Sequence, residues 1–494
     1  MKDYQRYFFI TLMAIVLGSL LAIFSWQVKP LPWKYTFTYS YLPHAVIDYL
    51  DSPESLRMIP LIVLIAFESM FIYALISPLA SIFLLISIIP VLDIRFVTTY
   101  MNIYLPAIFL LAILMAALSR RFAKGEKPFF KLRTMDKWGL VFLFYLWGSL
   151  GRAHSLRIGL KEIFSLSALF MAYFSIRLLS WDKEKFSKLS KWLAWIGGLV
   201  GGQAVLHFYL MKRGFLALYE ERFFRAYTSF GDPTLLANFL IMVIPLVGIF
   251  YFRARANGGE VKRPSKNVLQ RRTWGLMLLV MVVALFLTFS RSAWISLGLT
   301  LALLILVRLR GLKKMISILI LVIMVAGFVA MSKDKYVVND QLDINNRLRS
   351  IYARRDITFY ALKLVRQAPL IGIGPGNFSY FNTEYDTRDM VNTTVPNTYL
   401  HTLVISGVLG LGSLLTFLAL IVRSGFRIIN KSGLAKDGLI ISGLYIGVTA
   451  NLIHGLFENI FYNIISNWIF GLILGLLVSW EEGDSIGREW KSQS

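Results

Sequence analysis

Long hydrophobic runs, separated by shorter polar stretches, recur along most of the chain. Most are long enough for a helix to cross a hydrocarbon core about 30 Å thick, and they lack the alternation of barrel strands. Because a backbone in lipid must satisfy its own hydrogen bonds, the runs predict an all-α, polytopic membrane bundle of about 12–14 transmembrane helices. The candidate spans are residues 7–26, 57–77, 78–93, 102–118, 137–150, 159–178, 191–211, 235–252, 273–289, 292–307, 315–331, 398–422, 438–458 and 461–479.

One long polar interval, residues 332–397, separates two of these spans. Inside it, residues 352–368 have apolar side chains on one helical face and cations elsewhere, which predicts an amphipathic helix at the membrane surface. Three glycines follow, in the run Gly372-Ile-Gly-Pro-Gly376. No strand precedes this run, so it indicates a turn rather than a phosphate-binding loop. We expect the interval to cover one face of the bundle.

Charge assigns sides to the loops. Residues 120–137 hold seven basic and two acidic side chains, and residues 253–272 hold seven and one. These loops fall on the same side, which the positive-inside rule predicts to be cytoplasmic, together with both termini. The polar interval then faces outward. The formal net charge of +24 is explained by this loop bias, which argues against nucleic-acid binding.

The composition sets further bounds. The chain has no cysteine, which excludes disulfides, thiolate chemistry and cysteine metal ligands. We interpret the first hydrophobic run as a retained helix rather than a cleaved signal sequence. No internal repeat is visible. We divide the chain into N-terminal helices (residues 1–190), a second membrane region (191–480) that includes the polar interval, and a cytoplasmic tail (481–494).

Several arginines map to the outer side, where the positive-inside bias should deplete them. Arg291 is the most unusual, because the turn between its two spans is too short to lift it far into water. A guanidinium offers fixed donors that suit two phosphate oxygens, so a diphosphate is a natural ligand. The alternatives are a headgroup anchor or a salt bridge to an acid such as Asp232.

Two other segments carry candidate chemistry. Arg222 and Arg225 lie shortly before Asp232, which itself is a plausible helix cap. Asn397 and His401 lie where the chain re-enters the membrane. His401 could take a proton from a hydroxyl or be a hydrogen-bonded interface residue.

Acids at membrane depth are also candidates. Glu458 lies near the outer end of a span and Glu68 lies within one; an internal hydrogen bond would explain either equally well. The sequence contains no Gly-x-x-x-x-Gly-Lys-Ser/Thr motif, which would indicate ATP use. It also contains no Asp-x-Asp pair, which would indicate a divalent ion bridging a nucleotide-sugar. We expect no cofactor and no metal.

Four segments, taken in their order along the chain, resemble the O-antigen ligase and polymerase superfamily of bacterial membrane glycosyltransferases. The segments are residues 225–238, Phe289-Ser-Arg-Ser-Ala-Trp294, the stretch from Arg355 through Pro369 to Phe378, and the stretch from Asn397 to Gly410. Each is weak alone, and the ordered set is fairly specific. Together the four segments span about 180 residues of the carboxyl-terminal half, and the helices before about residue 190 carry little of the resemblance.

The resemblance implies metal-independent transfer of a glycan from undecaprenyl diphosphate to an acceptor sugar hydroxyl, at the outer face of the cytoplasmic membrane. The family's diphosphate-binding arginines match Arg225 and Arg291, and we expect Arg222 and Arg355 to add charge. The ligases have a histidine before the asparagine of the re-entry motif, where this chain has Pro396. His401, about one helical turn along, is our candidate base.

The full set of candidate site residues has two parts. The catalytic candidates are His401, Arg291 and Arg225, and the substrate-binding candidates are Arg222, Arg355, Asn397, Asp232 and Glu458. Pro396 favours a polymerase slightly over a ligase. The competing hypotheses are a lipid-linked oligosaccharide flippase or transporter, and a non-catalytic scaffold for envelope assembly. Expected partners are the lipid-linked glycan, a glycan or lipid acceptor, membrane lipids and other polysaccharide-assembly proteins.

Overall fold

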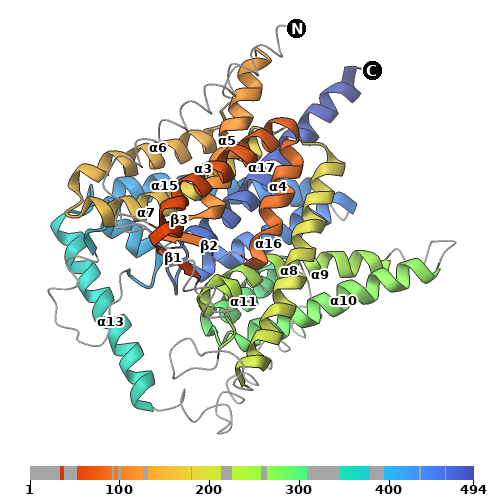
Figure 1. Ribbon diagram of the computed structural model, residues 1–494. Helices are drawn as coiled ribbons and strands as arrows, with labels where there is room; N and C mark the ends of the chain where they lie inside the picture. Colours follow the sequence, from red (N-terminus) through yellow and green to blue (C-terminus); the bar gives the residue numbers. More distant parts are fainter. Residues whose placement is uncertain are drawn as a thin grey trace.

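The computed structural model describes most of the chain (Figure 1). The described residues are 34–37, 53–91, 94–97, 102–125, 132–179, 181–212, 225–256, 264–308, 344–378, 394–432, 436–461 and 463–493. The α-helices are α3 (Pro53–Ile76), α4 (Pro78–Ser87), α5 (Leu105–Ala123), α6 (Thr134–Gly148), α7 (Leu156–Arg177), α8 (Lys183–Lys212), α9 (Pro233–Ala256), α10 (Pro264–Leu287), α11 (Arg291–Arg308), α13 (Ile344–Gln367), α15 (Thr398–Ser432), α16 (Lys436–His454) and α17 (Ile464–Gln493). Short 3-10 turns lie at Ile89–Val91, Ser149–Arg152 and Thr228–Phe230.

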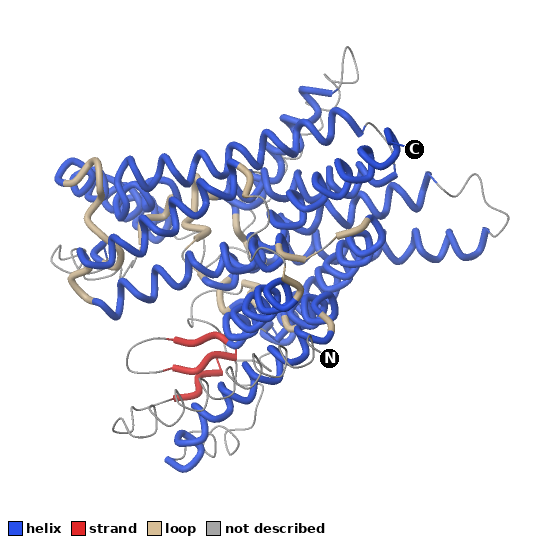
Figure 2. The backbone as a smooth tube through the Cα atoms, turned by 90° about the horizontal axis from the view of Figure 1, so that it is seen from above, coloured by secondary structure: helices blue, strands red, loops and turns tan. Residues whose placement is uncertain are grey.

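The prediction of a polytopic helical membrane protein is confirmed. Within the described ranges, six helices are long and apolar enough to cross a membrane, and four shorter apolar helices accompany them. One feature was not expected. Three short antiparallel strands, β1 (Lys34–Phe37), β2 (Ile94–Val97) and β3 (Asn102–Tyr104), form a small sheet at one edge of the molecule (Figure 2).

Twelve of the fourteen predicted spans coincide with described helices, with boundaries that differ by several residues. The other two, residues 7–26 and 315–331, lie outside the described residues. The amphipathic helix begins earlier than predicted, at Ile344 in α13. Helix α17 continues to Gln493, so the residues predicted as a tail begin inside a helix.

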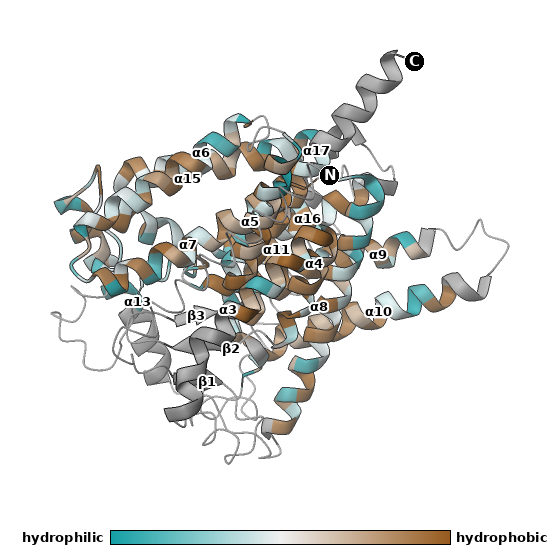
Figure 3. Cartoon of the chain, turned by 45° about the horizontal axis from the view of Figure 1, so that its top comes forward, coloured by the Kyte–Doolittle hydropathy of each residue, from teal (hydrophilic) through white to brown (hydrophobic). Residues whose placement is uncertain are grey.

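Neighbouring helices approach closely where glycines remove the side chain. Gly471 of α17 lies against the backbone of Leu169 in α7, and Gly447 of α16 lies against that of Met242 in α9; a Cβ at either glycine would meet a carbonyl oxygen at 2.0 or 2.1 Å. Such small-residue contacts are typical of helix packing in membranes. Hydrophobic positions run along the central helices, and polar positions on α9 and α10 gather toward the loop that joins them (Figure 3).

A buried ion pair joins α6 to α7. Arg177 Nη2 lies 3.0 Å from Asp136 Oδ2, and neither side chain is exposed to solvent. The Tyr173 hydroxyl donates a hydrogen bond of 2.5 Å to Asp136 Oδ1. A buried carboxylate is tolerated when charge and hydrogen bonds compensate it, as they do here.

Helix α15 is broken at Gly407, whose φ of 64° and ψ of −170° are not helical. The turn after α13 fills the break: Val408 N–H donates to Pro369 O at 2.9 Å and Gly374 N–H donates to Ile405 O at 3.0 Å. Backbone groups freed by the break therefore find partners inside the protein. The prediction of a turn at residues 372–376 is confirmed.

Candidate functional site

The segment before α9 is attached to the turn between α10 and α11. Arg225 Nε donates to Thr288 O at 2.8 Å, and Ala226 N–H donates to Leu287 O at 2.8 Å. Arg291 is the first residue of α11 and is exposed. Two of the segments singled out from the sequence therefore meet, and they bring Arg225 into the electrostatic range of Arg291.

Asp232 has the capping role expected of it. Its Oδ1 accepts hydrogen bonds from Thr234 N–H at 2.6 Å and Leu235 N–H at 3.2 Å, in the first turn of α9. A carboxylate there satisfies free N–H groups and interacts favourably with the helix dipole. Its negative charge also acts on Arg225, so the cap contributes to the local electrostatics.

A third arginine reaches the same place from α13. Arg354 Nη2 lies 2.6 Å from Glu458 Oε1, and its Nη1 donates to Phe457 O at 2.8 Å. Glu458 lies in the connection between α16 and α17. Helix α13 is thereby held to the end of the bundle, where its apolar face packs on a small hydrophobic cluster. The buried members of this cluster are Ile357, Ala361, Leu364, Phe378, Val395 and Val404.

We call Arg225, Arg291 and Arg354, with Asp232 and Glu458, the arginine cluster. Burial is the main cause that lowers the pKa of Arg225; the positive charges of the other two arginines add to it, and the two carboxylates oppose it. Burial raises the pKa of Glu458, as does Asp232, against the opposing effects of Arg354 and Arg225. Arg225 is half-buried and the other two arginines are exposed, and among the described residues of the cluster three positive charges lie near two negative ones. Such a group favours an additional anion.

The start of α15 is docked on the end of α16. Asn397 Oδ1 caps α15 by accepting from Tyr399 and Leu400 N–H, and its Nδ2 donates to Leu456 O at 2.9 Å. Thr398 Oγ1 donates to Glu458 O and accepts from Ile460 N–H, both at 2.9 Å. These bonds fix the backbone beside Glu458. Asn397 thus acts on the cluster through the backbone that it holds.

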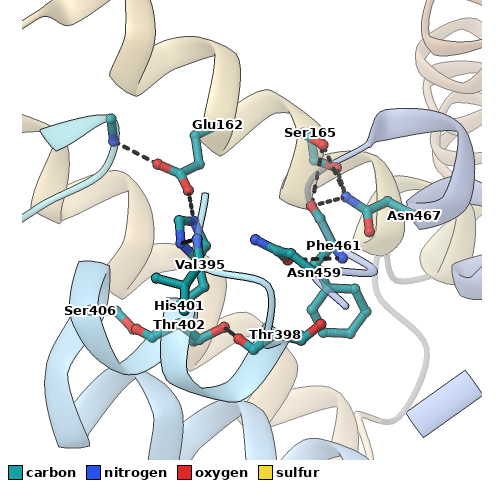
Figure 4. A network of polar contacts seen from close by, with 11 residues as sticks. Glu162, Ser165, Val395, Thr398, His401, Thr402, Ser406, Asn459, Phe461 and Asn467 are labelled. Carbon is teal, nitrogen blue, oxygen red and sulfur yellow. Dashed lines mark hydrogen bonds and ion pairs between the residues drawn. The ribbon is translucent and has the colours of Figure 1, made fainter. Parts of the chain in front are cut away.

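His401 lies in a different set of contacts (Figure 4). It is 5% exposed, its Nε2 binds the carboxylate of Glu162 in α7, and its Nδ1 accepts a hydrogen bond of 3.4 Å from Val395 N–H. The other Glu162 oxygen accepts from Gly376 N–H at 2.6 Å. Both ring nitrogens of His401 are engaged, so this geometry favours a structural role. The base role of His401 stays a prediction.

Two candidates remain. Arg222 lies outside the described residues. Arg355 forms an ion pair of 3.0 Å with its neighbour Asp356, and both are exposed. No role was predicted for Glu162 from its position, although it is an acid near the end of a predicted span, the same feature that marked Glu68 and Glu458 as candidates. Arg354 was likewise predicted only as one of the cations of the amphipathic helix, residues 352–368.

The fold and the site together define a polytopic helical membrane protein with a cationic site at one end of its bundle. Residues 276–415 match the family model described as O-Antigen ligase. This match confirms the resemblance to the O-antigen ligase and polymerase superfamily and implies a membrane glycosyltransferase-type enzyme. It includes Arg291, Arg354 and His401, whereas Arg225 and Glu458 lie outside it. No curated protein matches the chain.

Proposed function

We propose that this protein transfers a glycan or repeat unit from an undecaprenyl-diphosphate carrier to an acceptor sugar hydroxyl, at the outer face of a bacterial cytoplasmic membrane. The observation that carries the proposal is that Arg291 and Arg354, from two other segments of the chain, lie within electrostatic range of Arg225. The family match lends support, because residues 276–415 include two of these arginines.

The chemistry follows from the charges. The acceptor oxygen attacks the anomeric carbon of the donor sugar, and the bond between that carbon and the phosphate oxygen breaks. The bonding electrons go to the diphosphate, whose growing charge is stabilised by the preorganised guanidinium groups. Arginine can bind two phosphate oxygens at once, which also orients the leaving group. We infer that the cluster needs no metal for this step.

Pro396 favours polymerisation over ligation. It stands where the ligases of the resembled superfamily have a histidine, and Asn397 beside it caps α15. We therefore propose that the acceptor is a second lipid-linked glycan and that the product lengthens by repeat units. A flippase is the alternative.

The test uses purified protein in detergent, where flipping has no meaning, with lipid-diphosphate-linked repeat units as substrate. We expect a ladder of products from the wild type. Arg291→Ala and Arg225→Ala should each lower the initial rate by at least about 100-fold, as expected when one preorganised donor to the developing charge is lost. Gel analysis of labelled glycan gives the rate.

Arg366→Ala is the matched control, because Arg366 is an exposed arginine in the last turn of α13. It should keep the wild-type rate. A ladder of normal length and rate from Arg291→Ala would contradict the proposal. Absence of any product from the folded wild type, with the lipid-linked substrate bound, would favour the flippase.

A further inference from the structure

A buried histidine lies directly next to the arginine cluster. His454 is the last residue of α16 and has 0% exposure. Its Nε2 is 3.1 Å from Ser292 Oγ, and its Nδ1 is 3.2 Å from Asn238 Oδ1. The three side chains come from α16, α11 and α9, so three helices converge on one imidazole.

The partners fix the state of the ring. A carbonyl oxygen only accepts hydrogen bonds, so Asn238 Oδ1 places the hydrogen on Nδ1 of His454. The lone pair of Nε2 then faces the Ser292 hydroxyl. A hydroxyl beside a base that is itself oriented by a third group is the arrangement that activates oxygen atoms for proton transfer.

The position of Ser292 connects this set to the arginine cluster. Ser292 is half-buried and follows Arg291 in the first turn of α11, whereas its partner His454 is fully buried. Glu458 N–H donates to His454 O at 3.0 Å, so His454 lies one helical turn from the ion pair of Glu458 with Arg354. A half-buried hydroxyl therefore lies one residue from Arg291, the guanidinium that the proposed function assigns to the diphosphate.

A purely structural bond between helices explains these contacts incompletely. Asn238 is 1% exposed, and its Nδ2 has no hydrogen-bond partner within the described residues. Leaving a buried donor without a partner costs about 1–3 kcal/mol. Asn238 thus points its Oδ1 toward His454 and leaves its Nδ2 without a partner among the described residues. This orientation is expected if the protein needs one particular tautomer of the His454 ring.

We propose that Ser292 and His454 remove the proton of the acceptor hydroxyl. This inference rests on the proposed function. As the acceptor oxygen bonds to the anomeric carbon, its proton passes to Ser292 Oγ and the proton of Ser292 passes to His454 Nε2. His454, now positively charged, returns a proton through Ser292 to the released diphosphate. The relay takes the role that sequence reasoning gave to His401.

The test compares Ser292→Ala, Ser292→Thr and His454→Gln in the ladder assay, with a separate measurement of donor binding. Loss of general-base assistance costs about 10²–10⁴-fold in rate. We expect Ser292→Ala and His454→Gln to lower kcat at least 100-fold at unchanged KM for the lipid-linked donor. Ser292→Thr keeps a hydroxyl and should restore the rate to within about tenfold of wild type.

Ser296→Ala is the matched control, because Ser296 lies one turn along α11 and its Oγ donates only to Ser292 O, at 2.7 Å. It should keep the wild-type kcat. If Ser292→Ala and His454→Gln remain within threefold of wild type while Arg291→Ala is inactive, the relay is wrong and the proposed function stands. If Arg291→Ala is also active, the proposed function fails. Should His454→Gln not fold, the contrast between Ser292→Ala and Ser292→Thr decides, since equal rates in these two would overturn the relay.

Discussion

Glu458 is subject to opposing effects in the arginine cluster, because burial disfavours its charged form and the nearby arginines favour it. Its side chain is 21% exposed and bound to Arg354, yet burial keeps its pKa above the ordinary value for glutamate. A raised pKa means that the folded protein holds this proton more tightly than the unfolded chain does. Stability contributed by the protonated form is therefore lost as pH rises through the raised pKa.

Glu458→Gln should remove this pH dependence. At pH 7 the variant should melt at or above the wild-type temperature, because the uncharged amide avoids the cost of burying a carboxylate. The difference should shrink as pH falls toward 4.5, the ordinary value for glutamate. Thermal unfolding in detergent between pH 4 and 8 measures it. A variant that is less stable than the wild type at pH 7, with a gap that widens as pH rises, would contradict the assignment.

At the scale of single residues, the sequence predicted which side chains belong to the candidate site better than it predicted their contacts. Arg225, Arg291, Asp232 and Glu458 do come together. The pairing of Arg354 with Glu458 spans 104 residues and depends on how α13 lies against the end of α16, which no local pattern encodes. His401 was singled out for its residue type, and only the fold shows that Glu162 occupies its ring.

At the scale of elements, the break in α15 determines how the polar interval is attached to the bundle. Gly407 faces the turn after α13 so closely that a Cβ there would lie 2.4 Å from the carbonyl group of Leu370. Its φ of 64° also suits glycine far better than other residues. The helix can therefore break here without leaving a gap.

Gly407→Ala should destabilise the protein by more than about 1 kcal/mol, because the added methyl group meets backbone and the φ angle is unfavourable. Gly412→Ala, five residues along the same helix, is the control; a Cβ there meets nothing within 4 Å. Gly412→Ala should leave the free energy of unfolding unchanged or raise it by at most about 1 kcal/mol, because alanine has the higher helix propensity. Melting temperatures in detergent compare the two, and equal values would contradict the packing argument.

The hydrophobic pattern predicted the helices well because each run needs only its own length and composition to indicate a span. It missed the three-stranded sheet, whose pairing brings Tyr35 opposite Phe96 across a wide separation in sequence. It also predicted the amphipathic helix while starting it late, because most residues in the first turns of α13 are polar. Long-range pairing and polar helix ends are what a local pattern cannot supply.

For the whole molecule, the orientation in the membrane is a prediction from loop charge that can be tested directly. The chain has no cysteine, so single cysteines can be introduced without background labelling. Arg157, at the start of α7, and Lys188, in the first turns of α8, are both exposed and lie toward opposite ends of the bundle.

A membrane-impermeant thiol reagent should label Arg157→Cys in intact cells stripped of wall. It should label Lys188→Cys only after the membrane is opened, because the positive-inside rule places that end in the cytoplasm. Mass shifts of the purified variants give the result. Labelling of Lys188→Cys in intact cells would reverse the orientation and place the arginine cluster in the cytoplasm.

The buried pair between Asp136 and Arg177 has a consequence for how the chain enters the membrane during synthesis. The carboxylate emerges from the ribosome 41 residues before its guanidinium partner. Asp136 lies at the loop end of α6, and its burial is compensated only once Arg177 is in place. Packing of α6 against α7 is therefore expected to wait until the whole hairpin has been made.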